Sequence, residues 1–217
     1  MQNEIIVVGY QAYNFIPSLV VGEIEMIEFY LDLTEIDCLI FTSKNAIRSL
    51  EKSATKYPSM EIWKTIPSYV IGEMSAKTLQ EFGGRVEYIS TSSHAQDFCK
   101  EIAGFLAKKK CLYLRGEEIA SSLDQTLLKH GILLQSQIVY KNRCAEVLDA
   151  QPPPNGSYLI FTAPSAYRFF SSLFAWNSTY TAIALGKTTF SAFDQRINKI
   201  LSPFQNIQKT IAFLKSQ

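Results

Sequence analysis

One strand–turn–helix pattern occurs twice in the chain, and it constrains the fold more than any other feature. LIFTSKNAIRSL at Leu39–Leu50 matches LIFTAPSAYRFF at Leu159–Phe170. A second matched pair lies downstream, with YVIGEMSAKTL from Tyr69 and AIALGKTTFSAF from Ala182. The same order and similar spacing indicate a duplicated α/β domain.

Short apolar segments alternate with helical patterns along the whole chain, which is typical of parallel α/β units. We predict strands at Glu4–Gly9, Cys38–Thr42, Ser68–Gly72, Val86–Ser90, Cys111–Arg115, Leu133–Tyr140, Tyr158–Thr162, Thr181–Gly186 and Lys199–Ser202. We predict helices at Lys44–Lys56, Ser75–Phe82, His94–Lys108, Ile119–His130, Ser165–Phe174, Thr188–Arg196 and Asn206–Lys215. The fold class is therefore α/β with parallel sheets.

Two segments interrupt this rhythm. Ser18–Leu33 reads as extended, and Lys141–Ser157 contains three consecutive prolines, a composition typical of linkers. Too few strands follow the second break for a sheet of their own, so the N-terminal strand is expected to join them. The predicted organisation is a discontinuous first domain at 1–22 and 153–217, an inserted second domain at 35–139, and linker crossings at 23–34 and 140–152.

Composition narrows the function classes. Hydrophobic residues make up 47% of the 217 residues, and the formal net charge is +1, so no basic surplus points to nucleic acid. No apolar run approaches the roughly 20 residues that span a bilayer, and the N-terminus lacks a signal-peptide pattern. The four cysteines form no CxxC pair. We expect a cytoplasmic monomer that binds neither nucleic acid nor membrane.

The repeated turns carry small and hydroxyl residues between a buried strand and a helix. Backbone N–H groups at a helix start attract carboxylates and phosphates, and ligands of open parallel sheets bind beyond the carboxyl ends of the strands. Serine and threonine are also common N-caps without any ligand, so capping alone remains open for each turn. The hydroxyl residues at these turns are Thr42, Ser43, Ser75, Thr162, Ser165, Thr188 and Thr189.

Several familiar motifs are missing or incomplete. Gly186-Lys187-Thr188 matches the end of a phosphate-binding P-loop, but Thr181 stands where that loop needs its first glycine. His94 and His130 lie at a predicted helix start and helix end, where capping explains them. No pattern of metal ligands or of a redox cofactor is present, and we expect neither.

An ordered set of motifs resembles the uroporphyrinogen-III synthase family through nearly the whole chain. The motifs are FTSKNAI from Phe41, VIGEMSAKTL from Val70, LYLRGE from Leu112, IVY from Ile138, LIFTAPSA from Leu159 and ALGKTT from Ala184. The resemblance implies two flavodoxin-like domains, one inserted in the other and joined by a two-stranded linker, with no metal and no cofactor. It further implies cyclisation of hydroxymethylbilane, a linear tetrapyrrole with eight carboxylates, with inversion of ring D and loss of water in tetrapyrrole (heme) biosynthesis.

The same resemblance suggests roles for individual residues. Tyr140 matches the family tyrosine proposed as general acid, although packing at a strand end would explain it equally. Arg115 suits a substrate carboxylate or, alternatively, a salt bridge with Glu117 or Glu118. The other positions that match substrate-contacting turns are Ser43, Asn45, Ser75, Thr162, Ser165, Thr188 and Thr189.

Two other functions are compatible with the residues alone. One is a two-lobed module that binds an anionic small molecule without chemistry, and the other is a nucleotide enzyme using Lys187. The chain also departs from the family pattern in two places. No helix is evident between the first two strands, and the second copy of the repeat has Ala163 where the first copy has Ser43.

Overall fold

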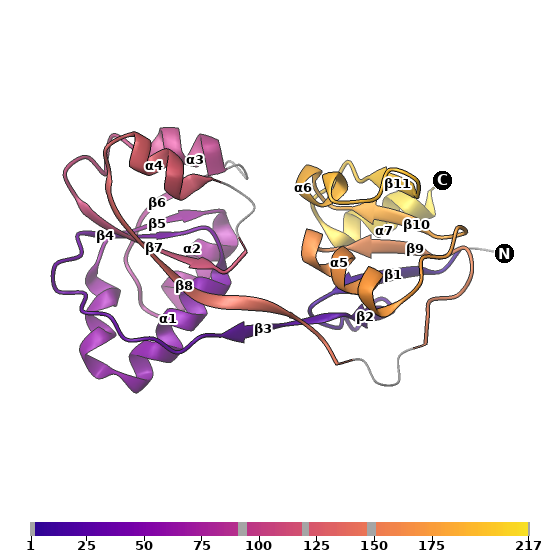
Figure 1. Ribbon diagram of the computed structural model, residues 1–217, viewed down its shortest axis with the longest axis horizontal. Coiled ribbons are helices and arrows are strands. Elements are labelled where there is room, and N and C mark those ends of the chain that lie inside the picture. Colours follow the sequence, from indigo (N-terminus) through magenta and orange to yellow (C-terminus); the bar gives the residue numbers. More distant parts are fainter. Residues whose placement is uncertain (1–2, 91–94, 119–121, 147–150, 217) are drawn as a thin grey trace. The chain divides into compact units, whose positions relative to one another are not determined.

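The chain divides into two compact units, which we describe separately. The computed structural model describes residues 3–90, 95–118, 122–146 and 151–216. Unit 1 comprises Met1–Ile24 with Asn142–Gln217, and unit 2 comprises Glu25–Lys141. Each unit holds one sheet with helices packed on it (Figure 1).

The unit 1 sheet has five strands, and all of its strand pairings are parallel. Numbered along this unit, they lie in the order 2-1-3-4-5, which flavodoxin-like sheets share. In sequence the strands are β1 (Ile5–Gly9), β2 (Ser18–Val20), β9 (Tyr158–Phe161), β10 (Thr181–Ala184) and β11 (Asn198–Leu201). The helices are α5 (Pro164–Leu173), α6 (Lys187–Ser191) and α7 (Ile207–Lys215).

The two faces of this sheet carry separate cores. Tyr167 and Phe170 of α5 pack against Leu159 and Phe161 on one face. On the other face α7 packs against alternate strand residues, as period-two side-chain geometry requires; these residues are Ile5, Val7, Ile160 and Ile183. Because both faces are covered, the strands are apolar throughout.

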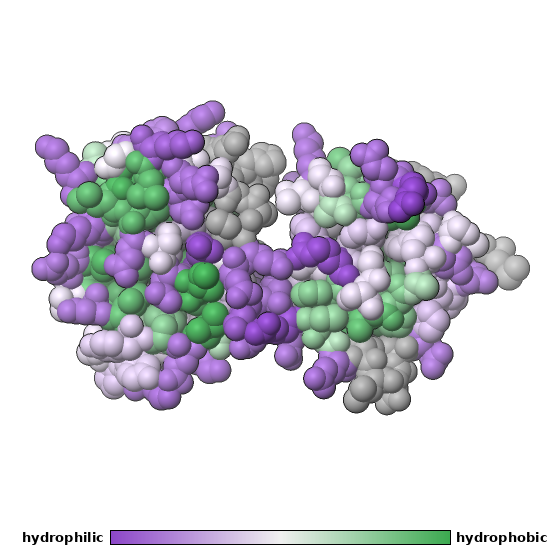
Figure 2. All heavy atoms as spheres, in the orientation of Figure 1, coloured by the Kyte–Doolittle hydropathy of each residue, from purple (hydrophilic) through white to green (hydrophobic). Residues whose placement is uncertain are grey.

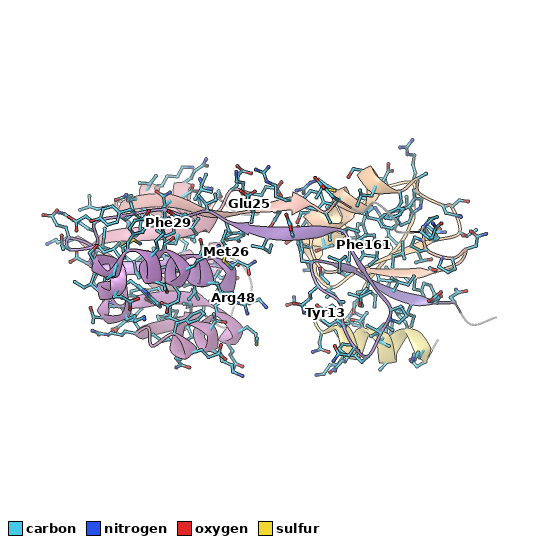
Figure 3. The ribbon with its side chains drawn as sticks, turned by 90° about the horizontal axis from the view of Figure 1, so that it is seen from below. Tyr13, Glu25, Met26, Phe29, Arg48 and Phe161 are labelled. Atoms are coloured by element: carbon cyan, nitrogen blue, oxygen red, sulfur yellow. The ribbon has the colours of Figure 1, made fainter. Side chains whose placement is uncertain are left out.

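No helix separates β1 from β2 in the described residues, as the sequence predicts. A short loop joins the two parallel strands instead, and Tyr13 and Ile16 of that loop pack against the core that α7 also covers. The Tyr13 backbone N–H donates to the Ser18 hydroxyl at 3.0 Å, which holds the loop against β2 (Figure 3 labels Tyr13 and Phe161). Side chains of the loop therefore replace the missing helix.

The unit 2 sheet has six strands in the order β3-β8-β7-β4-β5-β6. Counted from β4, the run from β6 to β8 reads 3-2-1-4-5, which is the classic doubly wound order 3-2-1-4-5-6 without its last strand, and its pairings are parallel. The strands are β3 (Gly22–Met26), β4 (Cys38–Phe41), β5 (Ser68–Ile71), β6 (Val86–Ser90), β7 (Lys110–Gly116) and β8 (Leu133–Cys144). The parallel sheets of the sequence prediction are confirmed.

Strand β3 runs antiparallel to β8. The Ile27 N–H donates to the Val139 carbonyl, and the Ala145 N–H donates to the Val21 carbonyl, each at 2.9 Å. One partner number rises as the other falls, which defines an antiparallel pair. The chain passes between the units inside these two strands.

Helices cover both faces of this sheet as well. On one face α1 (Lys44–Lys56) and α2 (Glu73–Glu81) bury Leu39 and Phe41, and on the other α3 (Ala95–Ile102) and α4 (Leu123–Lys129) bury Cys38 and Ile40. The cluster under α1 also contains Phe29 and Leu33, which lie in the predicted crossing 23–34; Phe29 is labelled in Figure 3.

Several element boundaries differ from the prediction; helix α3, for example, ends at Ile102 instead of Lys108. Strand β8 continues to Cys144 instead of ending at Tyr140, since it pairs with β3 beyond that point. Helix α6 ends at Ser191 instead of Arg196, because the Asp194 side chain accepts from the Arg196 N–H at 2.9 Å and forms a turn. A 3-10 helix, η1 (Pro58–Thr65), was not predicted. His94 and residues 119–121 of the predicted helices lie outside the described residues.

Candidate functional site

The residues singled out in the sequence lie near the carboxyl ends of parallel strands. In unit 2 some lie in the turns after β4 and β5, whereas Arg115 and Tyr140 lie within β7 and β8. In unit 1 the turns follow β9 and β10. Strand ends of this kind expose backbone N–H groups at helix starts.

A register shift at the end of β7 determines where Tyr140 lies. Arg115 pairs with Ile138, but the next residue, Gly116, pairs with Tyr140, so β8 contains one additional residue. Such a bulge redirects a side chain. The Val139 carbonyl holds the strand here, because it accepts from the Ser49 hydroxyl at 2.5 Å and from the Ile27 N–H at 2.9 Å.

Gly116 provides the space that the Tyr140 ring occupies. A Cβ atom on Gly116 would lie 2.7 Å from Cζ of Tyr140 and 2.9 Å from its hydroxyl oxygen. Those separations are well inside van der Waals contact, so only glycine permits this packing. The Tyr140 backbone is fixed as well, since its carbonyl accepts from the Glu117 N–H at 2.9 Å.

The surroundings of Tyr140 keep its phenol protonated. Burial raises the pKa of Tyr140 above its ordinary value of 10, and the nearby Ser43 hydroxyl opposes that rise by stabilising the phenolate. Ser43 is the N-cap of α1 and accepts from the Asn45 N–H at 3.2 Å. The phenol is therefore a proton donor at neutral pH beside a helix start.

Two further groups lie on the neighbouring strand β7. The Tyr113 hydroxyl and Thr42 Oγ1 are 3.0 Å apart, and burial raises the pKa of Tyr113. Arg115 donates from Nη1 to the carbonyls of Gly116 and Glu117, at 3.0 and 3.4 Å. These hydrogen bonds hold the guanidinium group next to the carboxyl end of β7.

The turn after β5 presents the third predicted position of unit 2. Gly72 has φ of +76°, a left-handed conformation that favours glycine, and it precedes α2. Ser75 lies in the first turn of α2 with 6% of its surface exposed, and its N–H donates to the Gly72 carbonyl at 3.2 Å.

In unit 1 the turn that corresponds to the Ser43 turn is built around Ser165, in the first turn of α5. Its hydroxyl oxygen accepts from the Tyr10 phenol at 2.5 Å and from the Asn142 side-chain amide at 3.4 Å. Tyr10 follows β1, and its ring meets Phe169 edge-on at 6.4 Å between centroids. With both acceptor positions used, Ser165 can offer its own O–H to a ligand.

The remaining predicted residues of unit 1 flank this cluster along the sheet. Thr162 directly follows β9, and its N–H donates to the Val8 carbonyl at 3.1 Å. Thr188 is exposed and Thr189 is buried in the single short turn of α6. Ala163 is the N-cap of α5 and supplies no side-chain cap.

Sequence reasoning missed Tyr10, Asn142 and Gly116. Tyr10 could have been found, because it comes directly after the apolar strand IIVVG, where the strand-end rule applies. Asn142 and Gly116 carry no local signal, since their importance depends on which strands pair and in which register.

Two broad features bear on the class of function. Within the described residues, no cluster of three metal-ligating side chains occurs. No helix in the same residues has both the length and the apolar character needed to cross a bilayer.

Comparisons with known proteins identify the family of the chain. The family model described as uroporphyrinogen-III synthase HemD matches residues 11–203. The structure of uroporphyrinogen-III synthetase from Helicobacter pylori 26695 is 34% identical, covers 99% of both chains and superposes with a TM-score of 0.87.

Two more distant proteins, one a solved structure and one a sequence relative, are also similar to this chain. A mutant uroporphyrinogen III synthase structure from the extremely thermophilic bacterium Thermus thermophilus shares the fold, at 14% identity and a TM-score of 0.64 over 99% of this chain and 98% of that one. The uroporphyrinogen-III synthase of Synechococcus elongatus is 22% identical over 70% of this chain, which spans 62% of that relative's length. On the family match and the Helicobacter structure together, the chain belongs to the uroporphyrinogen-III synthase family.

Proposed function

We propose that the protein is a uroporphyrinogen-III synthase, a lyase that cyclises hydroxymethylbilane to uroporphyrinogen III with loss of water. The observation that carries this proposal is the protonated phenol of Tyr140, fixed by Gly116 and placed beside the N-cap of α1. The family match supports the assignment over a binding module.

The chemistry requires a proton donor at one point. The C–O bond of the hydroxymethyl group breaks as Tyr140 protonates the leaving hydroxyl, which departs as water and leaves an azafulvenium cation and the Tyr140 phenolate. Loss of the pyrrole N–H proton then gives the neutral azafulvene, and that proton restores the phenol through solvent. Ring D then attacks through its substituted carbon, forming a spiro intermediate that opens and recloses with ring D inverted. The protein's remaining contribution is to fold the substrate so that this closure outruns closure without inversion.

The strand-end turns are suited to the substrate's carboxylates. Hydroxyl and backbone N–H donors at helix starts bind anions without a large positive net charge, which agrees with a formal net charge of +1. The proposed contacts are Ser43, Asn45, Ser75, Arg115, Thr162, Ser165, Thr188 and Thr189. Arg115 is oriented by the carbonyls of Gly116 and Glu117 and would pair with one carboxylate.

The oligomeric state, the cellular location and the need for cofactors can also be proposed. We infer a monomer, because helices or loops of the chain itself cover both faces of each sheet. We infer a cytoplasmic location because all four cysteines are free thiols, which suits a reducing compartment. Neither a metal nor a cofactor is required for the proposed steps.

The type of isomer formed tests the proposal directly. Purified protein mixed with hydroxymethylbilane should give the type III isomer, resolved by chromatography after oxidation to the porphyrin. The control without protein measures spontaneous closure to the type I isomer. Only type I product over a range of protein concentrations would overturn the proposal, and tight binding in that case would support a binding module.

Tyr10→Phe should weaken substrate binding more than chemistry. When the Tyr10 hydroxyl is removed, the Ser165 hydroxyl loses the 2.5 Å hydrogen bond that orients it. The loss of one hydrogen bond of about 1 kcal/mol corresponds to a KM about fivefold higher. Steady-state kinetics would measure KM and kcat separately. Tyr13→Phe, in the same loop, is the matched control.

A double-mutant cycle separates this role from a general weakening of unit 1. If Tyr10 acts through Ser165, then Tyr10→Phe combined with Ser165→Ala should be no worse than Ser165→Ala alone. Fully additive losses would show that Tyr10 acts independently of Ser165.

A further inference from the structure

Two buried cysteines lie side by side at the amino ends of β4 and β7. This end of the unit 2 sheet is opposite the carboxyl ends of the strands, where the candidate site residues lie. Cys38 begins β4 and is the register partner of Cys111 in β7. The two sulfur atoms are 2.8 Å apart, with the Cys38 thiol donating to Cys111. Both residues are almost completely buried, at 0% and 1% exposure.

The backbone at this position is compatible with a disulfide. Register partners on adjacent strands lie about 4.8 Å apart, within the Cα separations of roughly 4.4–6.8 Å that disulfides span. The side chains also point to the same face, since both sulfurs belong to one core cluster. No movement of either strand is needed to bring the thiols together.

One of the two cysteines lines a pocket. Cys111 lines a pocket of about 620 Å³ in unit 2. Apolar residues line much of it, and Figure 2 shows hydrophobic residues gathered beside α4. The apolar lining residues include Leu128, Ile132 and Leu133. Cys38 does not line the pocket, so a small reagent bound there lies next to Cys111 and not next to Cys38.

The pKa shifts of the two thiols also make Cys111 the more reactive of the pair. The Cys38 thiol, as a hydrogen-bond donor, lowers the pKa of Cys111, and the nearby Lys109 contributes further. The pKa of Cys38 is raised correspondingly. Because the thiolate is the nucleophile, Cys111 is the residue that would react.

We propose that Cys38 and Cys111 form a redox-reactive pair that a small hydroperoxide converts to a disulfide. The Cys111 thiolate attacks the peroxide, the O–O bond breaks, and the products are a Cys111 sulfenic acid and an alcohol or water. Cys38 then attacks the Cys111 sulfur, so that the S–S bond forms and the S–O bond breaks. The hydroxyl leaves as water with the Cys38 proton, and two thiols are oxidised as one peroxide is reduced.

The experiment treats the full-length reduced protein with hydrogen peroxide at a few equivalents. Intact mass should fall by about 2 Da, and proteolysis under non-reducing conditions should release one fragment linking Cys38 to Cys111. After denaturation, alkylation should modify two of the four thiols instead of all four, and dithiothreitol should restore the full number. A reacted protein that keeps four alkylatable thiols would overturn the proposal, as would a disulfide containing Cys144.

Two variants assign the order of attack. Cys38→Ala should stop the reaction at a Cys111 sulfenic acid, detected as a dimedone adduct, whereas Cys111→Ala should give neither adduct nor disulfide. Cys99→Ala is the matched control, because Cys99 is fully buried on α3 and its pKa is raised by burial alone; it should oxidise like the unchanged protein. A dimedone adduct on Cys38 in the Cys111→Ala protein would reverse the assigned roles.

Discussion

Tyr140→Phe is expected to lower kcat about 10²-fold, the lower end of what one general acid contributes, with folding intact. The variant keeps the ring that packs beside Gly116 and removes only the hydroxyl group. Loss of one partly buried hydroxyl changes the free energy of unfolding by about 1 kcal/mol. Initial rates of type III isomer formation measure the first effect, and thermal unfolding measures the second.

Tyr180→Phe is the matched control for this substitution. Tyr180 is buried in unit 1 and donates its hydroxyl to the Pro153 carbonyl at 2.5 Å, just before β10 begins and away from the carboxyl ends of the strands. It should lose stability without losing turnover. Equal turnover in the Tyr140→Phe and unchanged proteins would return Tyr140 to a packing role.

The pH dependence of turnover provides a second measurement on the same residue. Burial raises the pKa of Tyr140 above 10, and the protonated phenol is the active form. Activity that depends on this group is therefore present below that pKa and falls only as the pH rises through it. Between about pH 7 and pH 9 its protonation should not limit kcat.

Gly116→Ala is expected to reduce kcat by a similar factor, although the new methyl group carries no chemistry. Its Cβ would lie 2.7 Å from Cζ of Tyr140, so the ring must leave its position beside Ser43. Introducing one methyl into a packed site also costs about 1–3 kcal/mol of stability. Turnover and thermal unfolding should be measured on the same preparation.

Two comparisons show whether the effect passes through Tyr140. Gly104→Ala is the matched control, because a Cβ there meets no atom within 4 Å, and it should change neither quantity by much. The double variant Gly116→Ala with Tyr140→Phe should be no slower than the slower single variant. Multiplied losses in the double variant would mean that Gly116 acts by another route.

Much of each unit is predictable because its determinants are local. The run LIFT is apolar at every position but the last, which indicates a strand buried on both faces, and both copies form such strands, as β4 and β9. Ser43 was predicted as a turn hydroxyl and is the N-cap of α1. Those features depend on residues within a few positions of one another.

The positions of the proposed catalytic and redox groups depend on contacts between distant segments. Tyr140 meets Gly116 because β8 pairs with β7 with one additional residue, and Tyr10 meets Ser165 because β1 pairs with β9. Cys38 and Cys111, likewise, become neighbours only through the register of β4 with β7.

Short sequence segments are thus enough to predict the α/β class, the repeat and the hydroxyl-bearing turns, since side-chain periodicity and capping are properties of such segments. Which tyrosine meets which serine, and which thiols lie together, depends on how distant strands pair. A shift of one residue in strand pairing redirects every side chain that follows, and the contacts that set the register lie far apart in the chain.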